Sequence, residues 1–572
     1  MANFYTDNPD LVFLMERMMD WEAIVGMKER IGEEAECPFG SVEEAKTAYL
    51  EMLRDPVGEL AANRFAPRAA EVDEIGCRCE NGRVILPEAM ERNLKDLRDA
   101  QLMGMTIPRR YGGLQFPETV YTAAIEIVSR ADASLMNFFG LQGGIAETIA
   151  EFADEPLKEK YLPRMSAGEF TAAMALTEPD AGSDLAAVQT RAKEAGETAA
   201  RGDPAGSPWT ISGTKRFITN GCGDVILVLA RSEDPAKKGG GRGLSFFLVE
   251  KNPRVMVRRI ERKMGIHGVP TCELALDECP AWLIGTRGMG LARYTAWLML
   301  AARMAIGAQA QGIAQAALGE ALKYAAEREQ FGRPIRQFPQ VAAMLSNMRL
   351  LTEASRALLY RTSEIVDLHQ GAEARGRRDE AKRYGRLAEV LTPLSKYYAT
   401  EVANRVCYDA VQIHGGNGYM KEYPVERLYR DVRITNIYEG TSQIQINWAT
   451  PRLLRGDLDP LLDEEVHRTV ADAEIVEQRG RLREPLAMLG EARRFLLSAD
   501  ADYRERVGPP WVDLWIDVCV SFLLLRQAEQ WDYKKQVARH FIDAMLPRAR
   551  MNRDYVLGGR PMEANGPVEA AG

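Results

Sequence analysis

The chain contains few cysteines and histidines for its length. Its 572 residues include eight cysteines and five histidines, and no two cysteines stand in a CxxC spacing. A disulfide framework and a structural zinc site are therefore not expected. The closest pair, Cys77 and Cys79, has poor spacing for a shared metal, and we interpret it as two half-buried residues in a turn.

A surplus of positive charge is also missing. The formal net charge is −9, from 73 basic and 82 acidic residues, so nothing favours general attraction to nucleic acid or to an anionic membrane. The N-terminus has no basic region followed by an apolar one, and the most apolar stretch, 512–525, is too short to span a bilayer. We therefore expect a cytoplasmic protein with no integral membrane segment and no nucleic-acid partner.

The hydrophobic pattern divides the chain into helical and β regions. Apolar residues at spacings of three and four predict helices over 9–30, 42–72 and 87–105. From about 170, short segments rich in β-branched and aromatic residues predict a compact β domain. Helical spacing returns at 286 and continues past Pro451.

These changes of pattern predict an α+β architecture with several domains. The predicted parts are an N-terminal helical extension (1–39), an N-terminal α domain (40–168), a central β domain (169–285), a C-terminal helical bundle (286–450), an additional helical domain (451–546) and a loose tail (547–572).

Several polar stretches carry chemistry of their own. The turn in "LTEPDAGSDL" (176–185) contains Gly182 and Ser183 and exposes N–H groups and hydroxyls that suit an anionic pyrophosphate. In "KRFITNG" (215–221), Phe217 is placed to cover a flat ring and Thr219 to donate to a ring heteroatom. Each stretch alone is equally compatible with an ordinary turn or strand end.

Two candidates for acid–base chemistry stand near the end of the helical bundle. His414, in "QIHGGNGY" (412–419), has no nearby acid or cysteine to orient it, so we interpret it as a structural residue. Glu439, in "IYEGTSQIQ" (437–445), lies between an aromatic residue and a glycine, directly before residues that begin a helix. We expect Thr441 or Ser442 to cap that helix.

Taken together, "TEPDAGSD", "FITNG", "REQFG" (328–332), "QIHGGNGY" and "IYEGTSQIQ" occur in an order and at separations that resemble the acyl-CoA dehydrogenase family over roughly 40–450. The resemblance implies an N-terminal helical domain, a central β-barrel domain and a four-helix domain, with FAD at a subunit interface. Long members of the family add a C-terminal helical domain, which 451–546 resembles, and this implies a homodimer. "WIDVCVSFLLL" would then be an interdomain packing face, with membrane association as the alternative.

The resemblance also implies roles for individual residues. Where many relatives have Trp, this chain has Phe217, a smaller ring that should still stack on the flavin. The implied contacts with FAD are Leu176, Thr177, Gly182, Ser183, Phe217, Ile218 and Thr219 from one subunit, Arg328, Phe331, Gln412 and Gly416 from its neighbour, and Thr441 and Gln443 completing the site.

The resemblance makes Glu439 the catalytic base. It would take the α proton of an acyl-CoA thioester while the β hydrogen passes to flavin N5 as hydride, giving a trans-2-enoyl-CoA, with electrons then passed to electron-transferring flavoprotein. Arg303, Tyr438, Gly440 and Ser183 are the implied substrate contacts. One branch of the family carries its base on the long helix, where this chain has Ala302, so that alternative does not apply.

Physical reasoning adds two expectations for these residues. We expect desolvation by bound substrate to raise the pKa of Glu439 more than the helix N-terminus lowers it. Arg303 lies in an apolar run, so it either lines the active site or pairs with a buried acid.

Two rival functions share this scaffold. An acyl-CoA oxidase would reoxidise its flavin with oxygen, and the motifs barely distinguish it from a dehydrogenase. A DNA-binding flavoprotein would need a strongly basic C-terminal face, whereas this C-terminal block mixes both signs of charge. The acyl group stays open; 3-(methylthio)propanoyl-CoA is one candidate among medium-chain, cyclic and dicarboxylic substrates.

Overall fold

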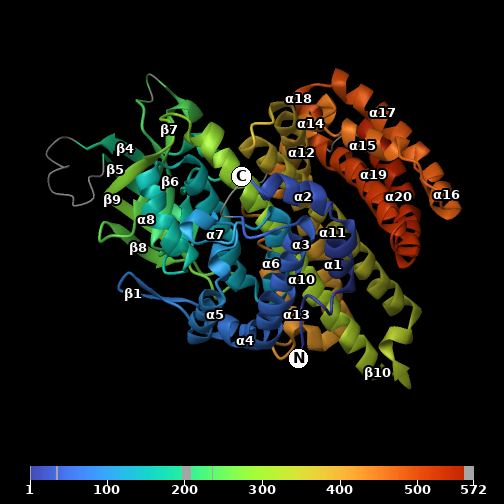
Figure 1. Ribbon diagram of the computed structural model, residues 1–572. Coiled ribbons are helices and arrows are strands. Elements are labelled where there is room, and N and C mark those ends of the chain that lie inside the picture. The colour runs from blue at the N-terminus through green and yellow to red at the C-terminus, as the bar shows by residue number, and fades with distance from the viewer. Residues whose placement is uncertain (1, 34–36, 196–207, 235, 237, 559–572) are drawn as a thin grey trace, which may run out of the picture.

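A computed structural model of the chain describes residues 2–33, 37–195, 208–234, 236 and 238–558. A β domain lies on one side of a long helical body, and a group of C-terminal helices lies on the opposite side (Figure 1). This order of helical, β and helical regions confirms the predicted α+β fold class.

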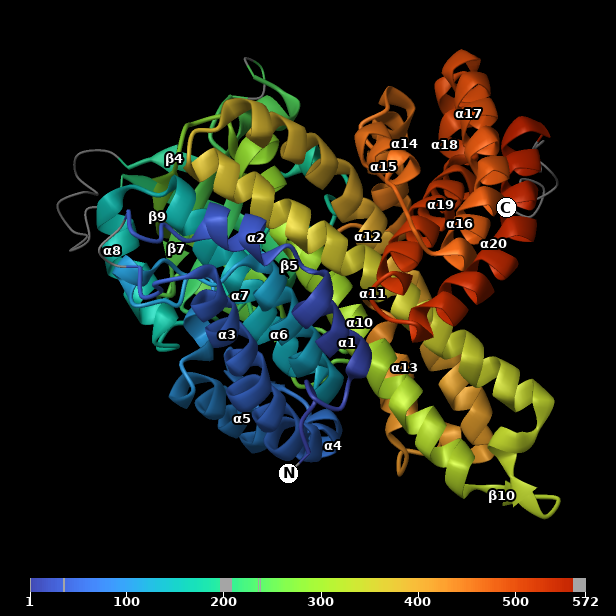
Figure 2. The same ribbon diagram turned by 45° about the vertical axis from the view of Figure 1, so that its right-hand side comes forward.

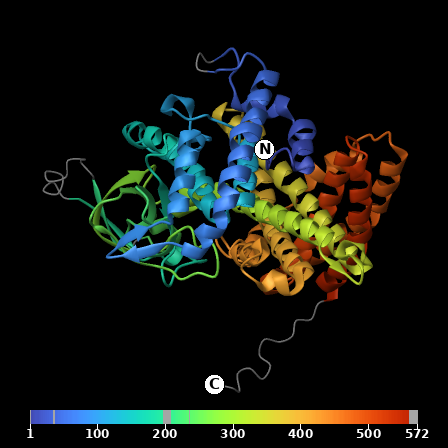
Figure 3. The same cartoon turned by 90° about the horizontal axis from the view of Figure 1, so that it is seen from below.

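The N-terminal region is helical, as predicted, with one short hairpin that the sequence analysis missed. The hairpin pairs β1 with β2 beside the β domain (Figure 3), and Cys77 directly precedes it, so Cys79 lies in a strand rather than a turn. The elements are α1 (Pro9–Phe13), α2 (Trp21–Lys28), α3 (Val42–Met52), α4 (Ala66–Ile75), β1 (Arg78–Glu80), β2 (Arg83–Ile85), α5 (Glu88–Asp99), α6 (Glu118–Ala131), α7 (Ala133–Phe152) and α8 (Glu155–Ser166).

The central strands close into a barrel. Pairing runs β6–β4–β5–β9–β7, and β7 pairs again with β6, while β3 lies parallel to β6 and β8 pairs with β9. The strands are β3 (Ala172–Ala175), β4 (Arg191–Glu194), β5 (Trp209–Thr219), β6 (Val225–Arg231), β7 (Leu244–Glu250), β8 (Val255–Ile260) and β9 (Thr271–Ile284).

Three long helices form the centre of the helical body. Small residues such as Ala314 and Ala317 are fully buried along α10, which lets α6 and α12 pack closely against it. The elements are α10 (Ala296–Glu327), β10 (Glu329–Gln330), β11 (Arg333–Pro334), α11 (Pro339–Ala374), α12 (Arg378–His414), α13 (Pro424–Val432) and α14 (Ser442–Arg455).

The C-terminal helices are longer than the sequence predicted. The last helix passes through Pro547 and ends at Gly558, so the predicted boundary at 546 is wrong; the rest of the predicted tail, 559–572, lies outside the described residues. The elements are α15 (Asp459–His467), α16 (Ala473–Arg481), α17 (Arg483–Ser498), α18 (Ala501–Arg506), α19 (Gly508–Ala528) and α20 (Tyr533–Gly558).

Helix α19 is the apolar centre of this domain. Within the described chain it is the one helix long and apolar enough to cross a membrane, so the expectation that this stretch is too short was wrong. However, 83% of its most apolar window is buried inside the structure. It packs against α20, α11 and α14, which confirms the predicted interdomain packing face.

A buried charge network joins the N-terminal helix α1 to the bundle and to the C-terminal domain. The guanidinium of Arg356 donates to Glu126 at 2.8 Å and to Asp10 at 2.6 Å. The ammonium of Lys534, on α20, pairs with the same Asp10 and with Glu353 at 2.7 Å. Burial alone would raise the pKa of Asp10, but Lys534 and Arg356 outweigh it and hold that pKa below its usual range.

The contact between α10 and α6 depends on one glycine. A Cβ at Gly312 would lie 2.2 Å from the carbonyl oxygen of Glu126 and 2.8 Å from the backbone nitrogen of Arg130, so the two helices would have to separate. We expect Gly312→Ala to lower the free energy of unfolding by about 1–3 kcal/mol, the usual range for overpacking.

Gly319 on the same helix is the matched control, because a Cβ there meets nothing within 4 Å. Gly319→Ala should raise the stability of α10 by about 1 kcal/mol through helix propensity alone. Urea unfolding of both variants measures the difference. Equal stability of the two variants would show that close packing at Gly312 is unimportant.

Candidate active site

Glu439 lies on a tight turn between α13 and α14. Its φ is +55° and that of Gly440 is +90°. The carboxylate therefore stands on a backbone conformation that residues other than glycine rarely adopt. The hydroxyl of Thr441 accepts from the N–H of Ile444 at 3.4 Å and caps α14. This confirms the first of the two predicted caps.

The turn is held from three sides. The amide of Gln445 donates to the carbonyl oxygens of Glu439 (3.1 Å) and Gly440 (2.8 Å). A Cβ at Gly440 would lie 2.6 Å from that amide nitrogen, which gives a direct steric reason for the glycine. The hydroxyl of Tyr438 donates to the side chain of Gln309 on α10, and Lys396 on α12 donates to the carbonyl oxygen of Gly440 at 2.7 Å.

The surroundings of Glu439 bring the pKa of its carboxyl group close to neutral pH. Glu439 is half-buried, and enclosure by protein raises its pKa to about 7, with Lys396 and Arg303 limiting the rise. Burial lowers the pKa of Lys396 to about 7 as well, against the raising influence of Glu439. Burial by the protein therefore already raises this pKa without substrate, and the further rise expected when substrate excludes water stays a prediction.

Arg303 lies beside this carboxylate. It is 8% exposed, and burial lowers the pKa of its guanidinium to about 10, while Glu439 raises it. Its Nε is buried without a hydrogen-bond partner in the described part of the chain, and its guanidinium lies 5.1 Å from the centre of the Trp448 ring. Of the two predicted roles, the position at the edge of the site fits better than a structural ion pair.

The first group of predicted cofactor residues meets at the ends of β3 and β5. The N–H of Arg216 donates to the carbonyl oxygen of Thr177 at 2.9 Å, which brings the segment 176–183 against the segment 217–219. Phe217 is 53% exposed and has a φ of +61°, so the end of β5 presents an aromatic side chain to solvent. Ser183 and Gly182 are exposed, whereas Ile218 and Leu176 are buried.

This surface fits a flat, anionic cofactor. An exposed ring beside Thr177 and Thr219, which are half-buried, offers a stacking face and nearby hydroxyl donors. The backbone of 182–183 lies open to solvent, as a pyrophosphate contact requires.

The second group lies at the far end of the helical body. The hairpin β10–β11 projects there, away from the β domain, and Phe331 at its tip is 94% exposed (Figure 2). Arg328, Gln412 and Gly416 are exposed at the same end, where Asn417 donates to the hydroxyl of Tyr324 at 3.0 Å. Within one chain the two groups do not meet.

His414 has a structural role, as interpreted from the sequence. Its Nδ1 is 2.8 Å from the carbonyl oxygen of Ala410, and its ring stacks on Tyr324 with centroids 4.2 Å apart. Among the residues with described positions, no group of three or more potential ligands could hold a metal ion.

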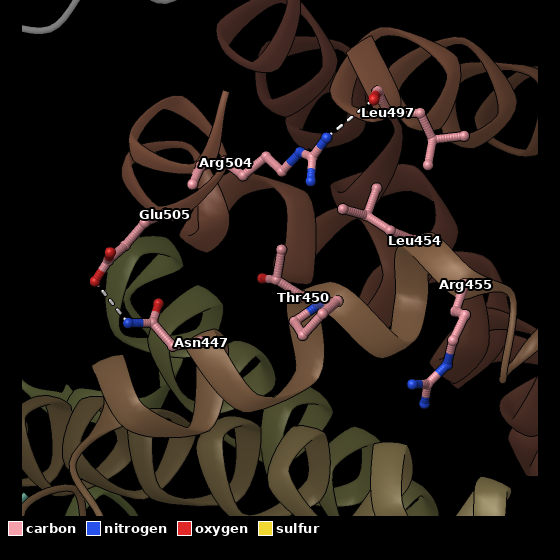
Figure 4. A pocket seen from close by; sticks show the side chains of 9 residues that line it. Asn447, Thr450, Leu454, Arg455, Leu497, Arg504 and Glu505 are labelled. Carbon is pink, nitrogen blue, oxygen red and sulfur yellow. Dashed lines mark hydrogen bonds between the residues drawn. The ribbon is translucent and has the colours of Figure 1, made fainter. Parts of the chain in front are cut away.

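A surface pocket of about 450 Å³, whose lining does not include Glu439, lies between α14, α17 and α18 (Figure 4). Asn447 donates to Glu505 at 2.7 Å, and Arg504 donates to the carbonyl oxygen of Leu497 at 2.9 Å. Because these polar groups satisfy one another, we assign the pocket no role in chemistry.

Lys396 is the residue that sequence reasoning missed. It stands in an ordinary helical stretch, and its burial results from the packing of other helices on α12. A lysine on the inner face of a predicted helix is the one signal that the sequence offered.

Three family models match the chain in order. They are described as acyl-CoA dehydrogenase, N-terminal domain (residues 47–169), middle domain (173–279) and C-terminal domain (287–454). The matched ranges agree with the helical, barrel and helical regions of the fold.

Individual proteins are similar over most of the chain. A 3-methylmercaptopropionyl-CoA dehydrogenase from Ruegeria pomeroyi is 35% identical, over 77% of this chain and 74% of its own. An acyl-CoA dehydrogenase from Bacillus subtilis is 36% identical, over 71% and 98%. A solved acyl-CoA dehydrogenase complexed with FAD, from Bacillus anthracis, shares the fold over 90% of this chain and 88% of its own, with a TM-score of 0.74 and 24% identity.

Proposed function

Because the chain belongs to the acyl-CoA dehydrogenase family, we propose that it is an FAD-dependent enzyme that converts an acyl-CoA thioester to the trans-2-enoyl-CoA. The observation that carries the proposal is the Glu439 carboxylate, half-buried on a fixed turn with its pKa raised to about 7. A general base works best with a pKa near the working pH.

The chain's own residues act on the α carbon of the substrate. Glu439 takes the α proton, which requires the developing negative charge on the thioester oxygen to be stabilised. In the described chain the backbone N–H of Glu439 donates to no acceptor, so it is free to bind that oxygen. Arg303 adds a fixed positive charge beside the base.

FAD, when bound, would accept the β hydrogen together with its electron pair. Residues 176–183 and 217–219 would hold it on one subunit. Since the β10–β11 hairpin, with the exposed Phe331 at its tip, projects away from the β domain (Figure 2), we propose that a second copy supplies the second group of residues and that the working enzyme is a homodimer. We further propose that electron-transferring flavoprotein removes the electrons.

The test is anaerobic mixing of the purified yellow protein with a panel of acyl-CoAs that includes a thioether acyl-CoA. At least one substrate should bleach the flavin and yield enoyl-CoA, in a species that sediments as two chains. Fast reoxidation by electron-transferring flavoprotein and slow reoxidation by air is the expected pattern. A colourless protein, or a flavin that no acyl-CoA reduces, would refute the proposal, and fast reoxidation by air would indicate an oxidase.

A further inference from the structure

The turn that carries Glu439 rests on a buried ammonium group. Lys396 is 1% exposed, and the hydrogen bond from its Nζ to the carbonyl oxygen of Gly440, 2.7 Å long, connects α12 with the turn across 44 positions in the sequence. Burying a charged amine is unfavourable unless an opposite charge or good acceptors compensate for it. Lys396 makes no ion pair within 4 Å to any acid in the described chain, so its compensation is the Gly440 carbonyl and the more distant field of Glu439.

The position of this ammonium suits the needs of the base. Glu439 and Gly440 both have positive φ angles, and a glutamate held in this conformation needs surrounding contacts to fix it. Gln445 supplies two of those contacts as a neutral amide, whereas Lys396 supplies one contact and, when protonated, a positive charge. A structural clamp alone would need no charge.

The charged groups that face Lys396 are few. Glu439 on the turn and Glu401 on α12 favour its ammonium form, and Arg303 on α10 opposes it. Glu401 already accepts hydrogen bonds from Ser442 and Asn436. Glu439, in turn, is faced by Lys396 and Arg303. The base therefore lies between two cations, of which Lys396 alone is bonded to its turn.

We propose that Lys396 is a positioning residue for the base: its ammonium fixes the Glu439 turn through the Gly440 carbonyl and keeps the Glu439 carboxylate ionised as bound substrate excludes water. The proposal rests on the proposed function and deepens it. Substrate binding removes water from the carboxylate, and a nearby positive charge in a dry site acts more strongly than in water. Lys396 thereby opposes the desolvation that would otherwise leave Glu439 protonated.

Three variants separate the charge from the hydrogen bond. Lys396→Met removes both, Lys396→Gln keeps an amide donor without the charge, and Lys396→Arg keeps the charge. Without the charge, the pKa of Glu439 should rise, so the acid limb of the pH–rate profile for flavin reduction moves to higher pH. For a rise of one pKa unit, the rate below the limb falls about 10-fold and recovers as the pH is raised.

Ser395→Ala is the matched control, because Ser395 is equally buried on α12 and its hydroxyl has no hydrogen-bond partner among the described residues. It should keep the wild-type profile, and so should Lys396→Arg. Infrared titration of ¹³C-labelled glutamate carboxylates gives a readout independent of turnover, and a carboxylate midpoint should rise in Lys396→Met and Lys396→Gln alone.

The outcomes are distinguishable. If the wild-type protein reduces its flavin with acyl-CoA and the acid limb stays unchanged in Lys396→Gln, the inference about Lys396 is overturned while the proposed function stands. If Lys396→Met fails to fold, Lys396→Gln and Lys396→Arg still decide the question. An equal shift in Lys396→Arg would also overturn it, because that variant retains the charge.

Discussion

Glu439→Gln is expected to lower the rate of flavin reduction by acyl-CoA by about 10²–10⁴-fold, the usual contribution of a positioned general base. The substitution keeps the shape of the side chain and removes its ability to accept the α proton. Because Gln445, Tyr438 and Lys396 hold the turn mainly through backbone and hydroxyl contacts, the protein should still fold and bind FAD. Stopped-flow absorbance of the flavin after anaerobic mixing measures the rate.

Two further variants test whether the loss of rate is specific to the position of the Glu439 carboxylate. Glu439→Asp places the carboxylate one methylene further from the substrate, and a misplaced base should recover only part of the rate. Glu477→Gln, on the exposed surface of α16, removes an acid far from the turn and should leave the rate unchanged. Wild-type rates in Glu439→Gln, with the flavin bound, would mean that another group is the base.

Local residue preference explains which strands were predictable. The sequence predicts strands within 169–177, 209–220, 224–232, 244–251 and 272–279, and the structure has them as β3, β5, β6, β7 and β9. Strand β4 reads Arg-Ala-Lys-Glu, which has no β-branched residue, and it is extended because its backbone pairs with β5 and β6. Strand β8 was also missed; it lies outside the closed ring and pairs with β9, and its residues alternate between half-buried and exposed along most of its length.

The residues of the candidate site also divide into those that the sequence predicts and one that it does not. Family resemblance supplied Glu439 and Tyr438, which lie within one of the ordered motifs, and Arg303, which follows Ala302 on the long helix. Lys396 has no motif of its own, and its role arises from a contact across 44 positions that only the packing of α12 against the turn creates. Residues that act through backbone carbonyls are invisible to motif reasoning, because any sequence can present a carbonyl.

The charge network at α1 should govern how firmly the C-terminal domain is attached. Lys534→Met is expected to lower the free energy of unfolding by about 3–5 kcal/mol, because it leaves the buried Glu353 without a cation and Asp10 with Arg356 alone. Lys535→Met is the matched control: the neighbouring ammonium pairs at the surface with Asp472 and Asp532, so its loss should change stability little. Thermal unfolding of the full chain compares the two.

The same network predicts which part of the chain loosens. Lys534 lies in the first turn of the last helix, α20, and α19 packs against α20 more extensively than against the bundle. These two helices should therefore be released together. Limited proteolysis of Lys534→Met should therefore cut first between α14 and α19. Replacing the two acids as well, with Asp10→Asn and Glu353→Gln, should recover part of the lost stability. Replacing all partners of a buried ion pair is often less destabilising than removing one of them. Equal stability and equal cleavage of the Lys534→Met and Lys535→Met variants would mean that apolar packing of α19 alone attaches the domain.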